Sequence, residues 1–340
     1  MFTPLRTERL VVRQPTLDDV ENLHARRNDP DVARLQDWEY PYPLERARAL
    51  IESVIEMGEP TNEEWWLGIV SLYDGRVVGD LAVNLTWEGR TAEVGYNLNS
   101  EDWGSGYATE ALTGLVDYLF DERGVTRVFG MLDPANPASA RVLERTGMLF
   151  EGHTKSSFWD GDEVSDDLIY GMVREDRDAW RSRPRNKPEE VSFIDVTVEN
   201  FAELSDLKTH ESQKSFVAPM LWSYSDALFP EVVDGAQVVP WMRGVLADGE
   251  PTGFVMLALS TEHHPETYLW RLLIDRMHQR RGIGQRVIEM VVEFCKGRGD
   301  TSLLTSWGEG IGSPRPFYES LGFVTTGRLL DDETEARLTF

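Results

Sequence analysis

The chain has 340 residues, 41% of them hydrophobic, and its length exceeds what one hydrophobic core usually serves, so two domains are expected. The formal net charge of -25 argues against nucleic acid as a partner, because clustered positive charge supplies most of that affinity. No apolar run approaches the roughly 20 residues that span a bilayer, and residues 1–13 lack the apolar stretch of a secretory signal, so we expect neither membrane binding nor export.

The first half of the chain predicts strands that alternate with helices. Leu10 and Val12 follow a strand pattern, and Asp18-Asp19 heads a helical stretch that reaches Arg27. Next come a helix over 44–57, strands over 65–73 and 76–85 around the turn Asp74-Gly75, a strand over 91–97, a helix over 108–120, a strand over 126–131 and a helix over 138–146.

The second half repeats this order. It predicts a strand over 191–197, helices over 200–208 and 223–229, strands around 248–249, a strand over 266–275, a helix over 285–295, a strand over 302–307 and a helix over 316–321. Residues 181–188 are polar, carry two prolines and lack periodicity. We therefore expect two copies of one α/β domain with a mixed sheet: a first domain over 1–178, a linker over 179–190 and a second domain over 191–340.

Cys295 is the only cysteine, and it lies in the apolar pattern of a predicted helix. It can form neither an intrachain disulfide nor a thiolate metal cluster, so we interpret it as a core residue of a cytoplasmic protein. The histidines show no metal-ligand spacing, and we predict no metal site.

A glycine turn joins a strand to a helix in each half, as Gly104-Ser105-Gly106 and as Gln279-Arg280-Arg281-Gly282-Ile283-Gly284. Glycine lets the backbone approach an anion closely, and the unpaired amides at a helix start point at phosphate oxygens. Glycine pairs are common in ordinary turns, but the strand before, the helix after and the repetition favour an anion site. Arg280 and Arg281 add positive charge there.

These motifs resemble the GNAT superfamily of N-acetyltransferases over nearly the whole chain. Residues 5–10, 93–96 and 103–111, with Asn136-x-x-Ser139, are similar to the branch that acetylates ribosomal-protein N-termini (RimJ/RimL type). Residues 216–219, 270–275 and 317–323 are similar to bacterial spermine/spermidine-type N-acetyltransferases. The resemblance implies two tandem acyltransferase domains.

The family's cofactor is acetyl-CoA, and its mechanism is direct attack of a neutral amine on the thioester, in which the protein mainly positions the reactants. The strand before each turn is expected to splay from its neighbour and free backbone donors for the cofactor. The residues implied in cofactor binding are Leu98, Trp103, Gly104, Ser105, Gly106, Tyr107, Ala108, Asn136 and Ser139 in the first half, and Leu272, Leu273, Ile274, Gln279, Arg280, Arg281, Gly282, Ile283, Gly284 and Gln285 in the second.

The resemblance also implies catalytic residues. Tyr318 holds the position of a tyrosine that protonates the departing thiolate, although it could simply pack beside Phe317. The first half has Leu143 at that position, which leaves Ser139 as the nearest polar candidate to contact CoA unless it only caps a helix. Glu93 is the candidate base, with a surface strand carboxylate as the alternative. In the second half Asp275, Glu309 and Glu333 are either acceptor-side groups or solvated loop carboxylates.

Three functional classes stay open at this stage. The first is an enzyme that acetylates a small-molecule amine or a peptide N-terminus. The second is a tandem with one catalytic domain and one CoA-binding regulatory domain, which Leu143 favours and the two intact turns oppose. The third is a binding protein that keeps the fold without turnover. The resemblance also leaves a homodimer open.

Overall fold

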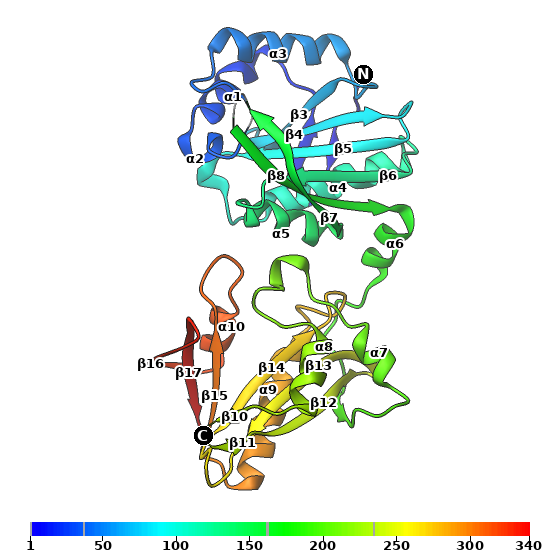
Figure 1. Ribbon diagram of the computed structural model, residues 1–340. Helices are drawn as coiled ribbons and strands as arrows, with labels where there is room; N and C mark the ends of the chain where they lie inside the picture. The colour runs from blue at the N-terminus through cyan, green and yellow to red at the C-terminus, as the bar shows by residue number, and fades with distance from the viewer. Residues whose placement is uncertain (1, 37, 161–162, 234) are drawn as a thin grey trace. The chain divides into compact units, whose positions relative to one another are not determined.

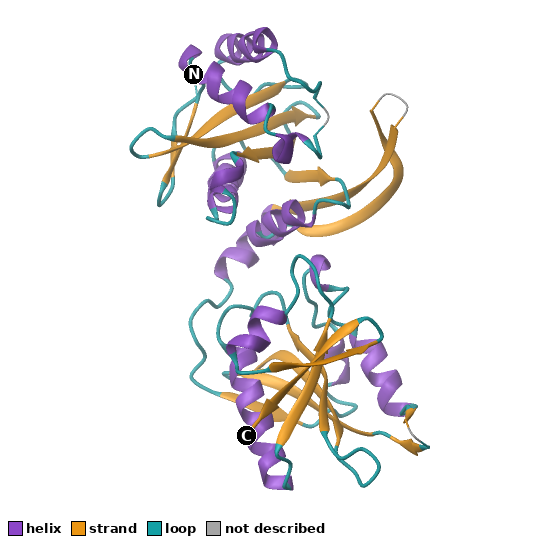
Figure 2. Ribbon diagram, turned by 90° about the vertical axis from the view of Figure 1, so that its left-hand side faces the viewer, coloured by secondary structure: helices purple, strands orange, loops and turns teal. Residues whose placement is uncertain are grey.

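The computed structural model describes residues 2–36, 38–160, 163–233 and 235–340. The chain divides into two compact units, Met1–Arg181 and Ser182–Phe340 (Figure 1). Each unit contains one mixed sheet with helices on either side of it (Figure 2). No helix within the described ranges is long and apolar enough to cross a membrane.

The first unit consists of these elements in chain order: β1 (Leu5–Arg6), β2 (Leu10–Arg13), the 3-10 helix η1 (Leu17–Asp19), α1 (Val20–Arg27), α2 (Pro30–Ala33), α3 (Leu44–Met57), β3 (Trp65–Leu72), β4 (Val77–Thr86), β5 (Thr91–Leu98), η2 (Ser100–Asp102), α4 (Tyr107–Asp121), β6 (Arg127–Leu132), α5 (Pro137–Thr146), β7 (Leu149–Asp160), β8 (Glu163–Val173) and α6 (Arg174–Ser182). Its eight strands are ordered β1-β2-β3-β4-β5-β6-β8-β7. Only the β5–β6 pair is parallel among these neighbours.

The second unit consists of β9 (Val191–Ile194), α7 (Phe201–Ser205), the 3-10 helix η3 (Glu211–Gln213), α8 (Met220–Leu228), β10 (Val232–Val233), β11 (Ala236–Gln237), β12 (Val239–Ala247), β13 (Glu250–Leu259), β14 (Thr267–Ile274), α9 (Ile283–Arg298), β15 (Ser302–Trp307), α10 (Arg315–Ser320), β16 (Val324–Leu330) and β17 (Glu333–Thr339). Its main sheet is ordered β9-β12-β13-β14-β15-β17-β16, with one parallel pair, β14–β15. This order matches β2-β3-β4-β5-β6-β8-β7, so the predicted duplication is confirmed.

Two groups of helices cover opposite faces of the first sheet. α1 is attached to one face by Arg26, whose Nε donates to Asp80 of β4 at 2.9 Å, both side chains being buried. Asp80 also accepts from Asn97 of β5, so alternation along β5 places Glu93 on this same face. α5 is attached to the other face, where the hydroxyl of Tyr96 donates to the carbonyl of Ser139 at 2.8 Å.

The second sheet likewise has two cores. One face packs α9 and α10 through Ile283, Val287 and Tyr318. The other face packs α8 through Met220 and Tyr224 against Phe254, Met256 and Leu273.

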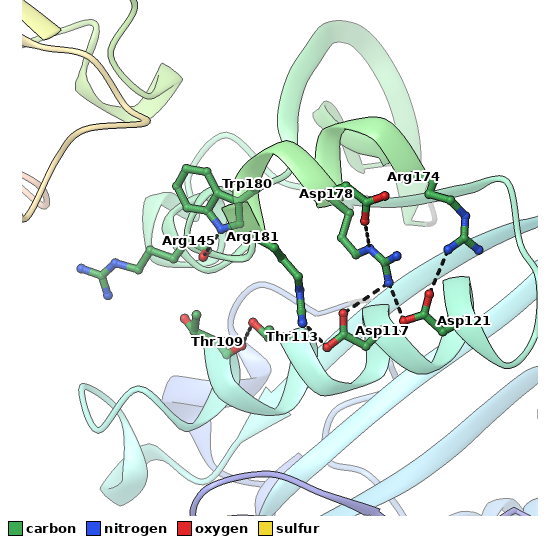
Figure 3. Close-up of polar contacts among 10 residues, drawn as sticks. Thr109, Thr113, Asp117, Asp121, Arg145, Arg174, Asp178, Trp180 and Arg181 are labelled. Atoms are coloured by element: carbon green, nitrogen blue, oxygen red, sulfur yellow. Dashed lines mark hydrogen bonds and ion pairs between the residues drawn. The ribbon is translucent and has the colours of Figure 1, made fainter. Parts of the chain in front are cut away.

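The expected boundary after residue 178 falls inside α6. This helix lies along α4: Arg177 pairs with Asp121 at 2.7 Å, Arg181 pairs with Asp117, and the indole of Trp180 donates to the carbonyl of Arg145 at 3.2 Å (Figure 3). Residues 179–181 of the expected linker therefore lie in the last turn of α6 and belong to the first unit.

Some elements are shorter than expected, and others were not predicted at all. The strand predicted over 191–197 ends at Ile194, and the helix predicted over 200–208 ends at Ser205. The strands over 149–160, 163–173, 324–330 and 333–339 and helix α6 were not predicted. The hairpin of β7 and β8 lacks an apolar alternation because much of it is exposed, which removes the pattern that sequence analysis relies on.

Candidate active site

The parallel strand pair opens part-way along its length in each domain. β5 pairs with β6 only from Thr91 to Glu93, although β5 continues to Leu98 and β6 to Leu132. β14 pairs with β15 only at Thr267 and Tyr268, although β14 continues to Ile274. Each sheet therefore has a wedge-shaped opening between two central strands, with its apex beside Glu93 and Tyr268 respectively.

Backbone amides line one edge of each opening. The amide of Asn99 donates to the carbonyl of Val78, and that of Asp275 to Thr252, so alternate residues of β5 and β14 point their donors the other way. The amides that face the openings are those of Tyr96, Leu98, Leu272 and Ile274. Leu273 was expected among them, but alternation turns its amide toward β13, because antiparallel pairing directs every second residue to the neighbouring strand.

The two glycine turns adopt the same backbone conformation. Gly106 and Gly282 each precede the following helix in the left-handed region, at φ 80°. The indole of Trp103 donates to the carbonyl of Leu98 at 3.3 Å, and the side-chain amide of Gln279 donates to the carbonyl of Ile274 at 3.1 Å. Trp103 and Gln279 thus make equivalent hydrogen bonds, each of which attaches the turn to the end of the central strand.

This equivalence aligns the two turns residue by residue. Gly106 corresponds to Gly282, Ala108 to Gly284, and Gly104, at φ 77°, to Arg280, at φ 65°. In the second domain a built side chain at Gly284 would lie 3.3 Å from Phe317 of α10. The second glycine of the motif therefore allows close helix packing, while Gly282 provides the turn.

Each turn presents amides that have no acceptor within the helix. The first i to i−4 bonds are those from Glu110 to Gly106 and from Arg286 to Gly282, both 3.1 Å. The amides of residues 107–109 and 283–285 precede them, at the positive end of a helix dipole. Because Gly106 and Gly282 are exposed, these donors fit an anionic group such as a diphosphate.

The side chains predicted to bind the cofactor at the second turn differ in their exposure and in their hydrogen bonds. Arg280 is exposed and has no hydrogen-bond or ion-pair partner in the ranges that the structure describes. The charge expected from Arg281 is not available, because this side chain is buried and donates to the carbonyl of Asn186 at 2.8 Å and contacts His278 at 2.9 Å. Ile283 is buried, so only its backbone can face a ligand, and the exposed side chain of Gln285 donates to Glu289 along the helix.

The left-handed Arg280 allows a direct test. Arginine in this conformation is strained by about 1 kcal/mol, so Arg280→Gly should leave the free energy of unfolding unchanged or raise it by up to about 1 kcal/mol. Loss of the charge should weaken acetyl-CoA binding at the second turn by about fivefold. Asp332→Gly, at φ 70° in the β16–β17 turn, is the matched control and should leave binding unchanged. Calorimetry and urea unfolding measure both effects, and unaltered binding by Arg280→Gly would exclude a role for its charge.

Comparisons with known proteins agree with this geometry. Residues 9–149 match the model of the acetyltransferase (GNAT) domain, and residues 201–323 match that of the acetyltransferase (GNAT) family. The "Probable N-acetyltransferase YjcK" of Bacillus subtilis is 32% identical over 157 residues, which cover 44% of this chain and 84% of that protein. The chain belongs to the GNAT acetyltransferase family.

Other similar proteins are also named as acetyltransferases. The "Uncharacterized N-acetyltransferase p20" of Bacillus licheniformis is 30% identical over 149 residues, 44% of this chain and 83% of that protein. A solved GNAT-family acetyltransferase from Bacillus anthracis is 28% identical, with a TM-score of 0.47 over 51% of this chain and 99% of that chain. The chain is an N-acetyltransferase with two GNAT domains in tandem.

In the second GNAT domain Tyr318 lies at the apex of the opening. Its hydroxyl faces Thr305, the residue of β15 that directly follows the last paired position, Leu304, and this neighbour offsets part of the rise in its pKa. The side chain is 7% exposed, and burial raises the pKa of Tyr318, so the hydroxyl stays protonated at neutral pH. The ring also packs in the core, stacked on Trp307 at 5.7 Å, so packing and proton donation are compatible roles here.

The first GNAT domain has a different hydroxyl group near its opening. Leu143, at the tyrosine position, is buried. The hydroxyl of Tyr96 lies 2.7 Å from that of Ser139, on the face that α5 covers. Asn136 caps α5 by accepting the amide of Ser139 at 3.1 Å, so its side chain has a structural role. Tyr96 was missed as a site residue, although its place three residues after Glu93 put it on the opposite face.

Glu93 lies at the apex of the first opening, on the face of α1. It is the last residue of β5 that pairs with β6, and it lies opposite Asn84 of β4. Burial, and next the charge of Asp167 on β8, raise the pKa of Glu93. The side-chain oxygen of Asn84 is buried without a hydrogen-bond partner in the described part of the chain. Asp167, which is 8% exposed, was missed because the β7–β8 hairpin was not predicted.

The pKa of Glu93 should be visible in the pH dependence of the first domain. A base is active as the carboxylate, so activity should be lost as the pH falls through the raised pKa. Asp167→Asn removes a neighbouring negative charge, lowers the pKa of Glu93 and should shift this acid limb of kcat/KM to lower pH. Glu93→Gln should remove the limb and reduce kcat/KM by about 100-fold. An unshifted limb in Asp167→Asn would show that another group titrates.

The acidic residues of the second GNAT domain have separate environments. Both oxygens of Asp275 accept backbone amides at 2.8 Å, from Lys208 and from Met277, so this carboxylate organises loops. Glu309 accepts from the indole of Trp307 at 3.3 Å, and Glu333 accepts from Ser306. Glu309 and Glu333 therefore lie around the end of β15, near the opening, whereas the carboxylate of Asp275 accepts backbone amides of neighbouring loops.

Proposed function

We propose that both domains bind acetyl-CoA and transfer its acetyl group directly to a primary amine. The observation that supports this most is the combination of an opened parallel strand pair with a left-handed glycine turn, present in both sheets. A covalent enzyme intermediate on cysteine is not part of the proposal, because Cys295 is fully buried and burial raises its pKa to about 12. A buried, unpaired cysteine also suits the reducing cytoplasm as the compartment.

The cofactor fits the donors that the structure presents. The amides of residues 107–109 and 283–285 would hold its diphosphate, and those that face the openings, from Tyr96, Leu98, Leu272 and Ile274, would hold its pantetheine arm. When bound, acetyl-CoA supplies an activated acetyl thioester. Gly282 allows this approach, since a built side chain there would already lie 3.1 Å from Lys187.

The first domain places proton-transfer groups on opposite faces of its opening. Glu93 projects toward α1, where it would take a proton from the acceptor ammonium. Tyr96 and Ser139 lie on the α5 face, where their paired hydroxyls would donate a proton to the departing thiolate. The amine would therefore approach from one face while the thiol leaves on the other, which suits a ternary complex.

In the second domain Tyr318 would donate the proton to the departing thiolate. The acceptor would enter from the face of α8. We infer a cationic acceptor, a small amine or a peptide N-terminus, because the carboxylates Glu93 and Asp167 flank one opening and Glu309 and Glu333 the other.

The alternative is a tandem in which the first domain binds CoA without turnover. Leu143 favours it, because the first domain lacks the tyrosine that the second has. Calorimetric titration with acetyl-CoA, followed by a thiol-release assay on an amine panel, tests both. Two binding sites with thiol release in chains that carry Gly106→Glu or Gly282→Glu singly support two enzymes. Release from only one of these variants supports the alternative, and absence of binding would refute both.

A further inference from the structure

The segment that leads into the second domain is held against that domain's glycine turn. The buried Arg281 donates to the carbonyl of Asn186 at 2.8 Å. The amides of Glu189 and Glu190 donate to Asp248 at 2.8 and 3.0 Å. Asp248 in turn lies 3.5 Å from the guanidinium of Arg281. Residues 186–190 are therefore attached at both of their ends to the domain that follows.

This attachment places Lys187 directly over Gly282. A side chain built at Gly282 would have its Cβ 3.1 Å from Cε of Lys187 and 3.6 Å from its Cγ. Lys187 is otherwise exposed. Its ammonium group is therefore close to the free amides that start α9.

The first domain also has a basic residue at its glycine turn, Arg9, which is ion-paired with Glu110 at 2.7 Å. Arg9, which directly precedes β2, lies with Nη2 3.5 Å from the Cβ built at Gly106. Its Nη1 donates to the carbonyl of Ser105 at 3.0 Å, and its guanidinium lies over the ring of Tyr107 at 4.8 Å. In both domains, therefore, a basic side chain from the segment before an equivalent strand, β2 or β9, lies next to the left-handed glycine.

More positive charge gathers around the same part of the linker. The pKa of Arg183 is lowered to about 10 by burial and by the nearby charges of Arg185 and Arg276. Lys187 forms no ion pair with any residue that the structure describes; of the nearby acidic residues, Asp248 pairs with Arg281 and Asp275 accepts backbone amides.

We propose that Lys187 binds the diphosphate of CoA, so that the interdomain linker is part of the second domain's cofactor site. The inference rests on the proposed function. The bound group would be a phosphate oxygen within reach of both the α9 amides and the ammonium, a charge-assisted contact. Because the linker's main chain is already attached through Asn186 and Asp248, little further ordering is needed for Lys187 to bind.

The test is calorimetric titration of the full-length chain carrying Gly106→Glu, so that only the second site is measured. Lys187→Gln should weaken CoA and dephospho-CoA alike, by about tenfold, and should make binding less dependent on salt. Lys187→Arg should restore most of the affinity. Lys296→Gln is the control with the same charge change, in the last turn of the same helix, where its ammonium lies 5.3 Å from the ring of Phe340. It should bind as the parent does.

Each other outcome overturns the inference. Unchanged binding by Lys187→Gln would mean that this side chain does not contact the cofactor. Tighter binding would mean that it blocks the free amides at the start of α9. Weaker binding of CoA alone would assign Lys187 to the 3′-phosphate. A loss of affinity in Lys296→Gln of the same size would reduce the effect to overall charge. If the parent with Gly106→Glu bound no CoA, the proposed second site would fail, and the inference with it.

Discussion

Gly282→Glu is expected to abolish acetyl-CoA binding at the second domain, with at least about a 100-fold loss of affinity. Three effects act together at this position. The backbone there is left-handed, at φ 80°, which costs a side chain about 1–2 kcal/mol. A carboxylate would project among the free amides of residues 283–285 and accept their hydrogen bonds in place of a phosphate. The new side chain would also displace Lys187, which lies 3.1 Å away.

Gly299→Glu is the matched control for Gly282→Glu. Gly299 ends the same helix in the same left-handed region, at φ 92°, and its built Cβ has no atom within 4 Å. It should therefore show the backbone cost in urea unfolding without loss of binding. Calorimetry on full-length chains with Gly106→Glu isolates the second site. If Gly282→Glu binds acetyl-CoA as its parent does, the diphosphate is not held at this turn.

Tyr318→Phe is expected to lower kcat of the second domain by about 100- to 1,000-fold, while KM for acetyl-CoA changes by less than about threefold. Phenylalanine keeps the ring contacts, namely the stack on Trp307 at 5.7 Å and the edge contact with Phe323 at 5.3 Å. The substitution therefore removes the hydroxyl at the apex of the opening and little else. A proton donor acts on the leaving group and not on cofactor binding, which explains the split between kcat and KM.

Steady-state assays in the Gly106→Glu chain report this turnover without the first domain. Tyr224→Phe removes another largely buried phenol, on α8, and should leave kcat within about threefold of the parent. Thr305→Val removes the neighbouring hydroxyl that lowers the pKa of Tyr318 and should have an intermediate effect. Parental turnover in Tyr318→Phe would leave this residue with a packing role alone.

Much of the architecture follows from local patterns. The helix at 44–57 was predicted at its observed bounds because its apolar face repeats every three to four residues, and β15 was predicted at its bounds because it is a short buried run. The glycine turns were found because left-handed backbone at a strand–helix junction requires glycine, and Gly106 and Gly282 both adopt it. The repeat of this order in the two halves predicted the tandem.

The site depends on contacts that local patterns do not contain. Trp103 and Gln279 make the same hydrogen bond, which is visible only once Leu98 and Ile274 are seen to end equivalent strands. The orientation of the Leu273 amide follows from pairing with β13.

Sequence analysis therefore predicted the family, the duplication and the two turns, because each depends on motifs of residues that are close together along the chain, and the duplication on their repetition. Tertiary structure alone established where each parallel pair opens, that Arg281 is buried, that Asp167 acts on Glu93, and that Lys187 covers Gly282. These features arise from long-range strand pairing and from charges brought together across a sheet. A side chain's neighbours across strands depend on register, which a single sequence does not specify.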